Sequence, residues 1–257
     1  MKPPPDTITR PGRIPRLYLD EEIIGHDLCL TSNQAHYLRQ VLRLKPGHAV
    51  TIFDGRGHEC LASITKLSRD GAELRVMSTT APIPESGLRV SLLQAIAKSE
   101  AMDLIVQKAT ELGVHEITPV ITEFCVVKLD EERAERRLEH WRRVAQSACE
   151  QSGRHTPTLI EAPQPLAACL AGLPPVGTRL ALDPYAESVY RGGRGQGDAT
   201  APLHLLIGPE GGLSERDLHL AARAGFTRAR LGPRILRVET ASMAACAIAQ
   251  AYWGDLG

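Results

Sequence analysis

The stretch "LLIGPEGGLSERDL", residues 205–218, decides the fold class of this chain. Its apolar beginning is typical of a strand and its proline and three glycines of a turn. Its polar end is typical of a helix, with Ser214 and Asp217 in a capping-box pattern. Residues 231–245, "LGPRILRVETASMAA", repeat the arrangement. Each turn alone is explained by a simple strand–helix connection. Two of them at neighbouring strand ends favour a bound ligand, because glycine allows positive φ and close approach to the backbone.

Strand-like and helix-like segments alternate around these two turns. Strands are expected within residues 88–97, 116–122, 158–160, 178–183, 204–208 and 229–232. Helices are expected at residues 99–112, 130–151, 165–171, 214–225 and 239–253. This alternation predicts an α/β fold with a mainly parallel sheet covered by helices. Ligands bind such sheets at the carboxyl ends of the strands, which is where both glycine turns fall.

The first third of the chain has a different pattern. Residues 16–77 hold short β-rich segments separated by Pro-Gly and Asp-Gly turns, which is typical of a small barrel. Residues 79–87, "TTAPIPESG", are typical of a linker. We therefore expect three parts: a disordered, proline-rich lead at 1–14, a β-barrel at 15–80 and the α/β domain at 81–257.

Composition limits the partners of the chain. Its 30 basic residues balance its 30 acidic residues, so nucleic-acid binding must come from local patches. No apolar run approaches the roughly 18 residues of a membrane span, and the N-terminus lacks the apolar region of a secretory signal. The six cysteines form no C-x-x-C pair, which argues against structural zinc. We expect a cytoplasmic protein with reduced thiols, no metal and no membrane contact.

One basic patch is predicted in "SNQAHYLRQVLRLKPGH", residues 32–48, a segment without acidic residues. A helix over this segment has one apolar face and one polar, cationic face. The residues on the cationic face are His36, Arg39, Gln40 and Arg43. Such a face binds phosphates, although an ordinary solvated helix face explains the pattern equally well.

Neither glycine turn matches a common nucleotide-binding loop. "GPEGG" fits neither G-x-G-x-x-G nor the P-loop. The first strand of the α/β region, within residues 88–97, runs into its helix without a glycine. A Rossmann-type dinucleotide or methyltransferase site would have its glycine loop there, so both interpretations lose support.

Together, "LLIGPEGGLS" and "LGPRILRVETA" resemble the cofactor-binding region of the SPOUT methyltransferases, specifically the RsmE family of 16S ribosomal RNA uridine-N3 methyltransferases. The resemblance covers nearly the whole chain. It extends through "RLYL", "HYLRQVLR" with the preceding Asn33, "DGRG", "KSEAMDLIVQKATELGV", "ITPV" and "CEQSGR". The chain departs from the family at Val238, where threonine is common, and in its proline-rich lead. Neither departure touches the glycines.

The resemblance implies a fold and an activity. The N-terminal domain would be a PUA-like barrel that helps to bind RNA. The C-terminal domain would hold a trefoil knot, which is a rare exception to ordinary connectivity. A homodimer would bind S-adenosylmethionine in the knot and methylate N3 of a uridine in the decoding region of 16S rRNA, with the assembled small ribosomal subunit as the preferred substrate. The two glycine turns would be successive walls of one cofactor slot.

Matching the motifs residue by residue assigns candidate roles. The cofactor-binding candidates are Leu206, Ile207, Gly208, Pro209, Glu210, Gly211, Gly212, Leu231, Gly232, Pro233, Ile235, Leu236 and Thr240. Thr240 is also a candidate cap for the last helix. The RNA-binding candidates are Arg16, Asn33, His36, Arg39, Arg43, Lys98, Glu100, Arg154 and Arg234. Helix-start capping is an alternative role for Lys98 and Glu100.

Arg237 and Glu239 are the catalytic candidates. Uracil N3 carries a weakly acidic proton, so the enzyme must align N3 with the methyl group and help the proton to leave. The guanidinium of Arg237 suits stabilisation of the developing uracil anion, and Glu239 either accepts the proton or orients Arg237. An Arg–Glu pair that only fixes the loop explains the same two residues.

Three other functions remain open on the sequence alone. The chain could be a nonenzymatic RNA-binding assembly factor, a SPOUT methyltransferase with a different RNA target, or a nucleotide-dependent oxidoreductase. The intact glycines argue against the first, the "HYLRQVLR" motif against the second, and the missing dinucleotide loop against the third.

Overall fold

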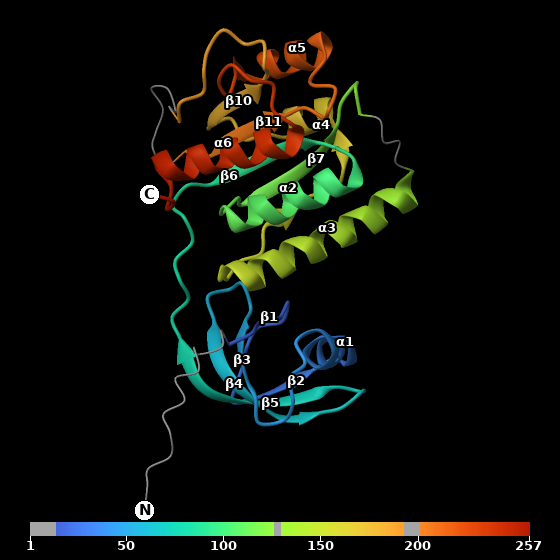
Figure 1. Ribbon diagram of the computed structural model, residues 1–257, viewed down its shortest axis with the longest axis vertical. Helices are drawn as coiled ribbons and strands as arrows, with labels where there is room; N and C mark the ends of the chain where they lie inside the picture. The colour runs from blue at the N-terminus through green and yellow to red at the C-terminus, as the bar shows by residue number, and fades with distance from the viewer. Residues whose placement is uncertain (1–13, 126–129, 193–200) are drawn as a thin grey trace, which may run out of the picture. The chain divides into compact units, whose positions relative to one another are not determined.

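The computed structural model describes residues 14–125, 130–192 and 201–257. Within these ranges the chain divides into two compact units, with the boundary between Ile83 and Pro84. Figure 1 shows the β-rich first unit in blue and the mixed second unit in green to red. The expected disordered lead, apart from its last residue, lies outside the described residues.

The first unit is built on a five-stranded sheet with the strand order β1-β3-β4-β5-β2. The strands are β1 (Arg16–Tyr18), β2 (Asp27–Leu30), β3 (Ala49–Phe53), β4 (Glu59–Leu67) and β5 (Ala72–Thr80). β1 pairs with β3 in parallel, and the other neighbours are antiparallel. The β-rich fold predicted for this region is confirmed, although the short strand β2 was not expected.

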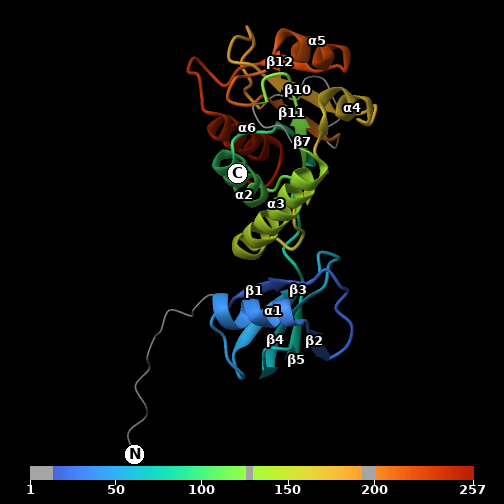
Figure 2. The ribbon, with the colours of Figure 1, turned by 90° about the vertical axis from the view of Figure 1, so that its right-hand side faces the viewer.

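A short helix and a π-helical turn replace the single helix expected over residues 32–48. They are α1 (Ser32–His36) and η1 (Tyr37–Val41), and Figure 2 shows α1 beside the sheet of this unit. Ala35 and Leu38 anchor them, because both side chains are buried in the core formed with the strands. The helical segment ends before Arg43, whose backbone is left-handed with φ of 55°. Arg43 therefore does not continue the helix face of His36, contrary to the sequence prediction.

The second unit contains a seven-stranded sheet in which the described pairs of named strands are all parallel. The strand order is β12-β10-β11-β6-β7-β8, and β9 also pairs with β7. The strands are β6 (Val90–Ala95), β7 (Glu116–Ile121), β8 (Leu159–Ile160), β9 (Gln164–Pro165), β10 (Thr178–Leu182), β11 (Leu203–Ile207) and β12 (Thr227–Ala229). The parallel sheet predicted from the alternation is confirmed.

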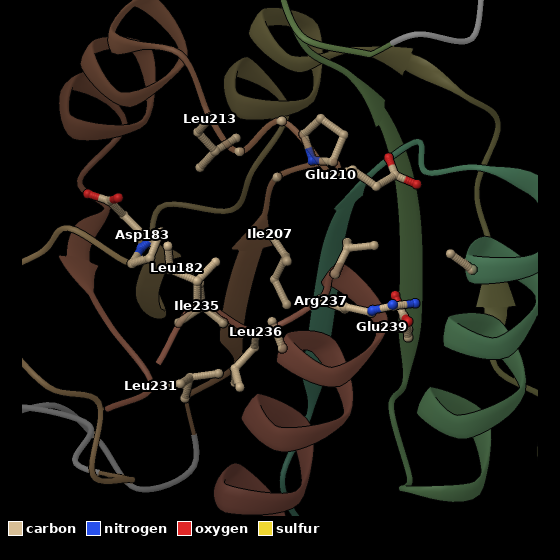
Figure 3. Close-up of a pocket in the computed structure, with 18 of the residues that line it drawn as sticks. Leu182, Asp183, Ile207, Glu210, Leu213, Leu231, Ile235, Leu236, Arg237 and Glu239 are labelled. Carbon is tan, nitrogen blue, oxygen red and sulfur yellow. The ribbon is translucent and has the colours of Figure 1, made fainter. Parts of the chain in front are cut away.

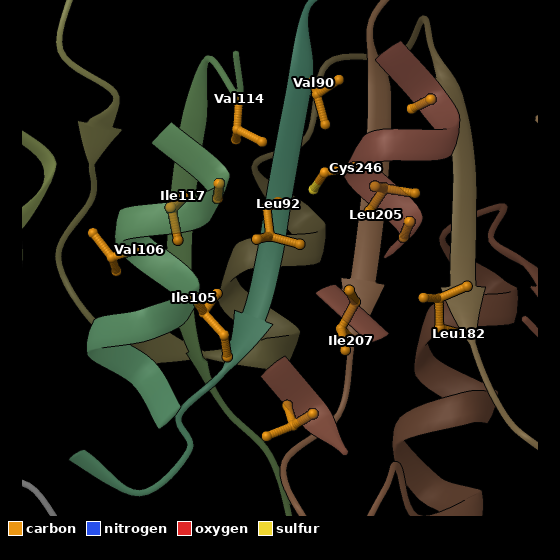
Figure 4. Packing of buried hydrophobic residues seen from close by; sticks show 14 of the residues in the cluster. Val90, Leu92, Ile105, Val106, Val114, Ile117, Leu182, Leu205, Ile207 and Cys246 are labelled. Carbon is orange, nitrogen blue, oxygen red and sulfur yellow. The ribbon is translucent and has the colours of Figure 1, made fainter. Parts of the chain in front are cut away.

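Helices cover both faces of this sheet. They are α2 (Ser99–Glu111), α3 (Glu131–Ser152), α4 (Leu166–Ala171), α5 (Glu215–Arg223) and α6 (Val238–Trp253). Because successive strand residues point to opposite faces, Leu92 and Leu205 pack with α2, α3 and α6, whereas Leu93 and Leu206 pack with α4 and α5. Figure 4 shows the first of these clusters. Each fully buried leucine contributes about 1.5–3 kcal/mol to folding.

The sequence predicts caps for two helices, α5 and α6, and the structure contains one of them. Ser214 and Asp217 form the predicted capping box, because each side chain accepts a hydrogen bond from the other's backbone N–H at 3.1 Å. Thr240 does not cap α6, contrary to the prediction. The helix begins earlier, at Val238, with Arg237 as a cap residue that makes no side-chain capping bond. Burial of Val238 in the core explains this earlier start.

Candidate active site

A cavity of about 790 Å³ lies at the carboxyl ends of β10 and β11. Its walls come from the turn after β11, the loop between β12 and α6, the residues after β10 and the start of α2. Figure 3 shows this cavity with the side chains that line it. Ligand pockets in proteins have volumes of about 300–1,000 Å³, so a cofactor-sized molecule has room here.

Glycines build the turn after β11. A Cβ atom at Gly208 would lie 2.6 Å from the carbonyl carbon of Gly212 and 2.8 Å from the amide nitrogen of Leu213, so a larger residue does not fit. Gly212 has a φ of +77°, in the left-handed region that favours glycine. The Oε1 atom of Glu210 accepts a hydrogen bond of 3.0 Å from the backbone N–H of Lys98. The turn is therefore tied to the start of α2.

One end of the cavity, beside β10 and β12, is apolar. Figure 3 shows Leu182, Leu231 and Ile235 together on the side of Ile207 that is remote from Arg237. Tyr185, which is exposed, also lines the cavity, from the segment after β10. This end suits a flat, uncharged group.

Asp183 holds the segment after β10 in place. Its buried carboxylate accepts hydrogen bonds from Nε of Arg228 at 2.9 Å and from the backbone N–H of Tyr185 at 3.0 Å. The hydrogen bond from Arg228 to Asp183 raises the pKa of the arginine, so the arginine stays charged. These bonds fix the backbone turn that connects the end of β10 to Tyr185.

The other end of the cavity, beside α2, is charged. Figure 3 shows Arg237 and Glu239 there, Lys98 lines the cavity from the start of α2, and Arg234 lines it from the loop before α6. Within the described ranges, none of the three cations forms an ion pair. Lys98 and Arg237 are the cap residues of α2 and α6, so the dipoles of both helix starts add to the positive field. This end suits an anionic or electron-rich group.

A buried hydrogen bond positions α6 on the sheet. The hydroxyl of Ser242 donates to Oε1 of Gln94 at 2.7 Å, and both side chains are buried. Because Gln94 lies near the carboxyl end of β6, this bond fixes the first turns of α6 against the sheet. It thereby fixes Arg237 and Glu239 at the cavity.

Comparison with known proteins identifies the family. A family model of the RNA methyltransferase domain matches residues 84–250, and one of the RNA methyltransferase PUA domain matches residues 30–77. The ribosomal RNA small subunit methyltransferase E of Buchnera aphidicola (subsp. Schizaphis graminum) is 31% identical over 245 residues. These cover 95% of this chain and 98% of the relative. The chain belongs to the ribosomal RNA small subunit methyltransferase E family.

Solved structures agree with this assignment. Ribosomal RNA small subunit methyltransferase E from Neisseria gonorrhoeae, bound to S-adenosylmethionine, has 37% identity and a TM-score of 0.89 over 95% of this chain and 100% of that one. A putative methyltransferase from Legionella pneumophila, in complex with the same cofactor, has 35% identity and a TM-score of 0.88 over the same shares. The family resemblance and the α/β fold with an N-terminal PUA-like domain, both predicted from the sequence, are confirmed.

The cavity of this family member contains most of the predicted site residues. The predicted cofactor-binding residues that line it are Ile207, Gly208, Pro209, Glu210, Gly211, Gly212, Leu231, Ile235 and Leu236. The predicted catalytic and RNA-binding residues that line it are Arg237, Glu239, Lys98, Glu100 and Arg234. The predicted residues outside its lining are Leu206, Gly232, Pro233 and Thr240. The side chain of Leu206 is buried on the opposite face of the sheet, toward α4 and α5.

Arg154, which the sequence predicts to contact RNA, lies at the amino-terminal edge of the sheet, away from the cavity. Its Nε and Nη2 atoms donate to Oε2 of Glu85 at 3.0 and 2.7 Å. Its Nη1 atom donates to the carbonyl oxygens of Thr110 and Val114 at 2.8 and 3.0 Å. Since the side chain is also largely buried, this geometry supports a role in the packing of the unit, and RNA contact by Arg154 stays a prediction.

The other RNA-binding candidates belong to the first unit. Those that are exposed are Asn33, His36 and Arg43. Arg39 is half-buried against the sheet. Arg16 forms a 2.7 Å ion pair with Glu59, and its guanidinium lies 4.4 Å from the ring centre of Phe53. Arg16 thus contributes to the packing of the sheet, and the exposed residues remain accessible to a partner.

Sequence reasoning missed the segment after β10. The cavity-lining residues that it left unassigned there are Leu182, Asp183, Pro184 and Tyr185. The available signal was an Asp-Pro pair at the end of a strand, which favours a turn. Nothing in the sequence pairs Asp183 with Arg228, which follows 45 positions later.

The described residues offer neither a metal site nor a membrane span. No group of three or more His, Cys, Asp or Glu side chains among them is arranged to hold a metal ion. No described helix is long and apolar enough to cross a membrane. The cavity presents backbone groups, apolar side chains and charged side chains of both signs to a ligand.

Proposed function

We propose that this protein transfers the methyl group of S-adenosylmethionine to N3 of one uridine in the decoding region of 16S rRNA. The observation that carries the proposal is that the two glycine motifs, separate in the chain, form walls of one cavity at the strand ends. Family membership supports it, because the chain matches the small subunit methyltransferase E of Buchnera over nearly its whole length. Two related structures were solved with S-adenosylmethionine.

The residues present fit this cofactor. Adenine is a flat, neutral aromatic group, and it suits the apolar end formed by Leu182, Leu231 and Ile235. The turn at Gly208 and Gly212 carries no side chain that would block approach to the backbone. When bound, S-adenosylmethionine supplies an activated methyl group, and the charged end of the cavity leaves room for the acceptor.

The chain's own residues have two tasks at the charged end. Arg237 donates hydrogen bonds to a uracil carbonyl oxygen, which stabilises the negative charge that develops as N3 loses its proton. The carboxylate of Glu239 accepts that proton, and N3 gains the methyl group in its place. Holding N3 in line with the methyl group contributes up to roughly 7–11 kcal/mol for ideal geometry.

The RNA must present one unstacked uridine. N3 of a paired or stacked base is hidden, so the target base is flipped into the cavity. Lys98 and Arg234, which form no ion pair within the described ranges, are available to the phosphates beside the target. In the first unit, the exposed side chains of Asn33, His36 and Arg43 are available to the same RNA.

The proposed domain bounds, knot, oligomeric state, location and substrate are those that the family resemblance implies. They comprise a lead at 1–14, a PUA-like barrel at 15–80, a knotted methyltransferase domain at 81–257, a cytoplasmic homodimer and the assembled small subunit as substrate. The family matches at 30–77 and 84–250 support the two domains.

Contacts between the segment after β10 and the segment after β12 support the knot. Arg230 donates its N–H to the carbonyl of Ser188 at 2.9 Å and accepts from the N–H of Tyr190 at 2.8 Å.

Two measurements test the proposed function. Calorimetric titration with S-adenosylmethionine is expected to show binding. Incubation with labelled cofactor and small subunits from cells that lack this activity is expected to label 16S rRNA. Folded protein that binds no cofactor would overturn the proposal and leave an RNA-binding assembly factor. Binding accompanied by labelling of a different RNA would leave a SPOUT methyltransferase with another target.

A further inference from the structure

We infer that Tyr185, together with Ile235, covers the adenine of the bound cofactor. We call these two side chains the apolar cover. The inference rests on the proposed function, because it assigns residues of this chain to one end of the proposed cofactor. It goes beyond the glycine motifs, because Tyr185 lies outside both of them.

The exposure of the two side chains is the first observation. Tyr185 is 79% exposed and Ile235 is 74% exposed, although both line the cavity. Large apolar side chains that stay in water gain free energy when a ligand removes that surface from water. Both side chains therefore have surface available for contact with a ligand.

The rigidity of their supports is the second observation. Asp183 holds the turn before Tyr185 through its hydrogen bonds to Arg228 and to the Tyr185 backbone. Arg230 joins that segment to the loop that carries Ile235, because its Nη1 atom donates to the carbonyl of Ala186 at 2.9 Å. The two parts of the apolar cover thus stand on segments that are joined to each other.

The position of the apolar cover decides which ring it contacts. Ile235 lies at the apolar end of the cavity, and Tyr185 lines the cavity from the segment just after β10, whereas Arg237 lies at the charged end beside α2. The uracil must reach Arg237, so it occupies the charged end. The adenine therefore occupies the apolar end, where the ring of Tyr185 stacks on it and the side chain of Ile235 packs against it.

Binding measurements with the full chain test this inference. The ligands are S-adenosylmethionine and 5′-methylthioadenosine, which keeps the adenine and lacks the amino acid part. Tyr185→Ala is expected to weaken both ligands about tenfold, as loss of one base–aromatic stack does. Tyr185→Phe is expected to bind both within about twofold of wild type, because it keeps the ring. Ile235→Ala is expected to weaken both ligands, and Ile24→Ala, which removes a 73% exposed side chain of the first unit, to leave both unchanged.

The outcomes separate this inference from the proposed function. Wild-type affinity of Tyr185→Ala for both ligands would overturn the inference. If the KM for small subunits rises in that variant instead, the ring contacts the RNA. Wild-type protein that binds no S-adenosylmethionine would overturn the proposed function itself. Thermal unfolding midpoints confirm that each variant is folded, which is expected for side chains as exposed as these.

Discussion

At Gly208 a single added carbon atom would change the shape of the cavity. Gly208→Ala places a Cβ atom 2.6 Å from the carbonyl carbon of Gly212, so the turn has to shift. We expect a loss of about 1–3 kcal/mol in stability, as for other overpacked sites, and a loss of affinity for S-adenosylmethionine of about tenfold or more. Thermal unfolding and calorimetry measure the two effects.

Gly87→Ala is the matched control for that substitution. A Cβ atom at Gly87 meets no atom within 4 Å, and its φ is not positive. We expect wild-type stability and affinity. If Gly208→Ala behaves like Gly87→Ala, the turn does not shape the cofactor site.

Arg237 is the residue on which the proposed chemistry depends most. Arg237→Ala is expected to lower the methylation rate about 10²–10³-fold, because it removes the hydrogen-bond donor to the developing uracil anion. The Kd for S-adenosylmethionine is expected to stay the same. Single-turnover methylation and calorimetry check the two expectations. Arg223→Ala, on the exposed end of α5 outside the cavity lining, is the control. An unchanged rate in Arg237→Ala would refute its role.

At the residue scale, the sequence singles out residues of the cavity wall where they lie within a continuous motif. The residues of "GPEGG" and most of "LGPRILRVE" line the cavity as expected. Prediction failed where the role depends on contacts between distant residues. Asp183 becomes a support for Tyr185 only because Arg228 reaches it from β12, and no local pattern contains that pairing.

At the scale of elements, Arg154 joins the end of α2, the start of β7 and Glu85. Arg154→Met is expected to lower the free energy of unfolding by about 3 kcal/mol, because it removes the guanidinium from a largely buried pair and leaves Glu85 only the Thr156 backbone N–H and His155. Arg136→Met removes an exposed arginine from an exposed pair, and we expect about 1 kcal/mol or less. Urea unfolding measures both. Unchanged stability of Arg154→Met with weaker RNA binding would favour the original RNA-contact prediction.

His204, on β11, makes the free energy of unfolding of the second unit depend on pH. The imidazole is buried, neither ring nitrogen has a partner among the described residues, and burial followed by the nearby Arg179 lowers its pKa to about 4. The unfolded chain binds the proton near pH 6.5, while the native state stays neutral down to about pH 4. Stability contributed by the neutral imidazole is therefore present above pH 6.5. It is lost by up to about 1.4 kcal/mol per pH unit as the pH falls through this window.

Urea unfolding between pH 4.5 and 7.5 checks this expectation. Tryptophan fluorescence reports on the second unit alone, because Trp141 and Trp253 both belong to it. His204→Leu is expected to lose less stability than wild type as the pH falls. Parallel loss in the two proteins would show that His204 does not control this dependence.

The order of the helices and strands of the second unit could be predicted from the sequence, but some of their first and last residues could not. Alternation of apolar runs predicted the parallel sheet, because each strand is buried on both faces by helices. The start of α6 was misplaced because tertiary burial of Val238 outweighed the local capping signal of Thr240. The two-residue strand β9 was missed because it carries no periodic signal of its own.

At the scale of the whole molecule, the fold determines where positive charge collects. The net charge is zero, yet the cavity gathers Lys98 from the start of α2 and both Arg234 and Arg237 from the loop before α6. Composition could not predict this concentration of charge, since the fold creates it by ending parallel strands at one edge. The binding of RNA by this chain is therefore expected to depend on local charge and to weaken with salt.

Identification of the methylated nucleoside tests the central claim most directly. Small subunits from cells that lack the activity are incubated with the protein and labelled S-adenosylmethionine, and the 16S rRNA is then digested and analysed by mass spectrometry. The account predicts label in 3-methyluridine at a single position in the decoding region with wild-type protein, and nearly none with Arg237→Ala. Label in any other nucleoside, or no label from folded protein that binds the cofactor, would contradict it.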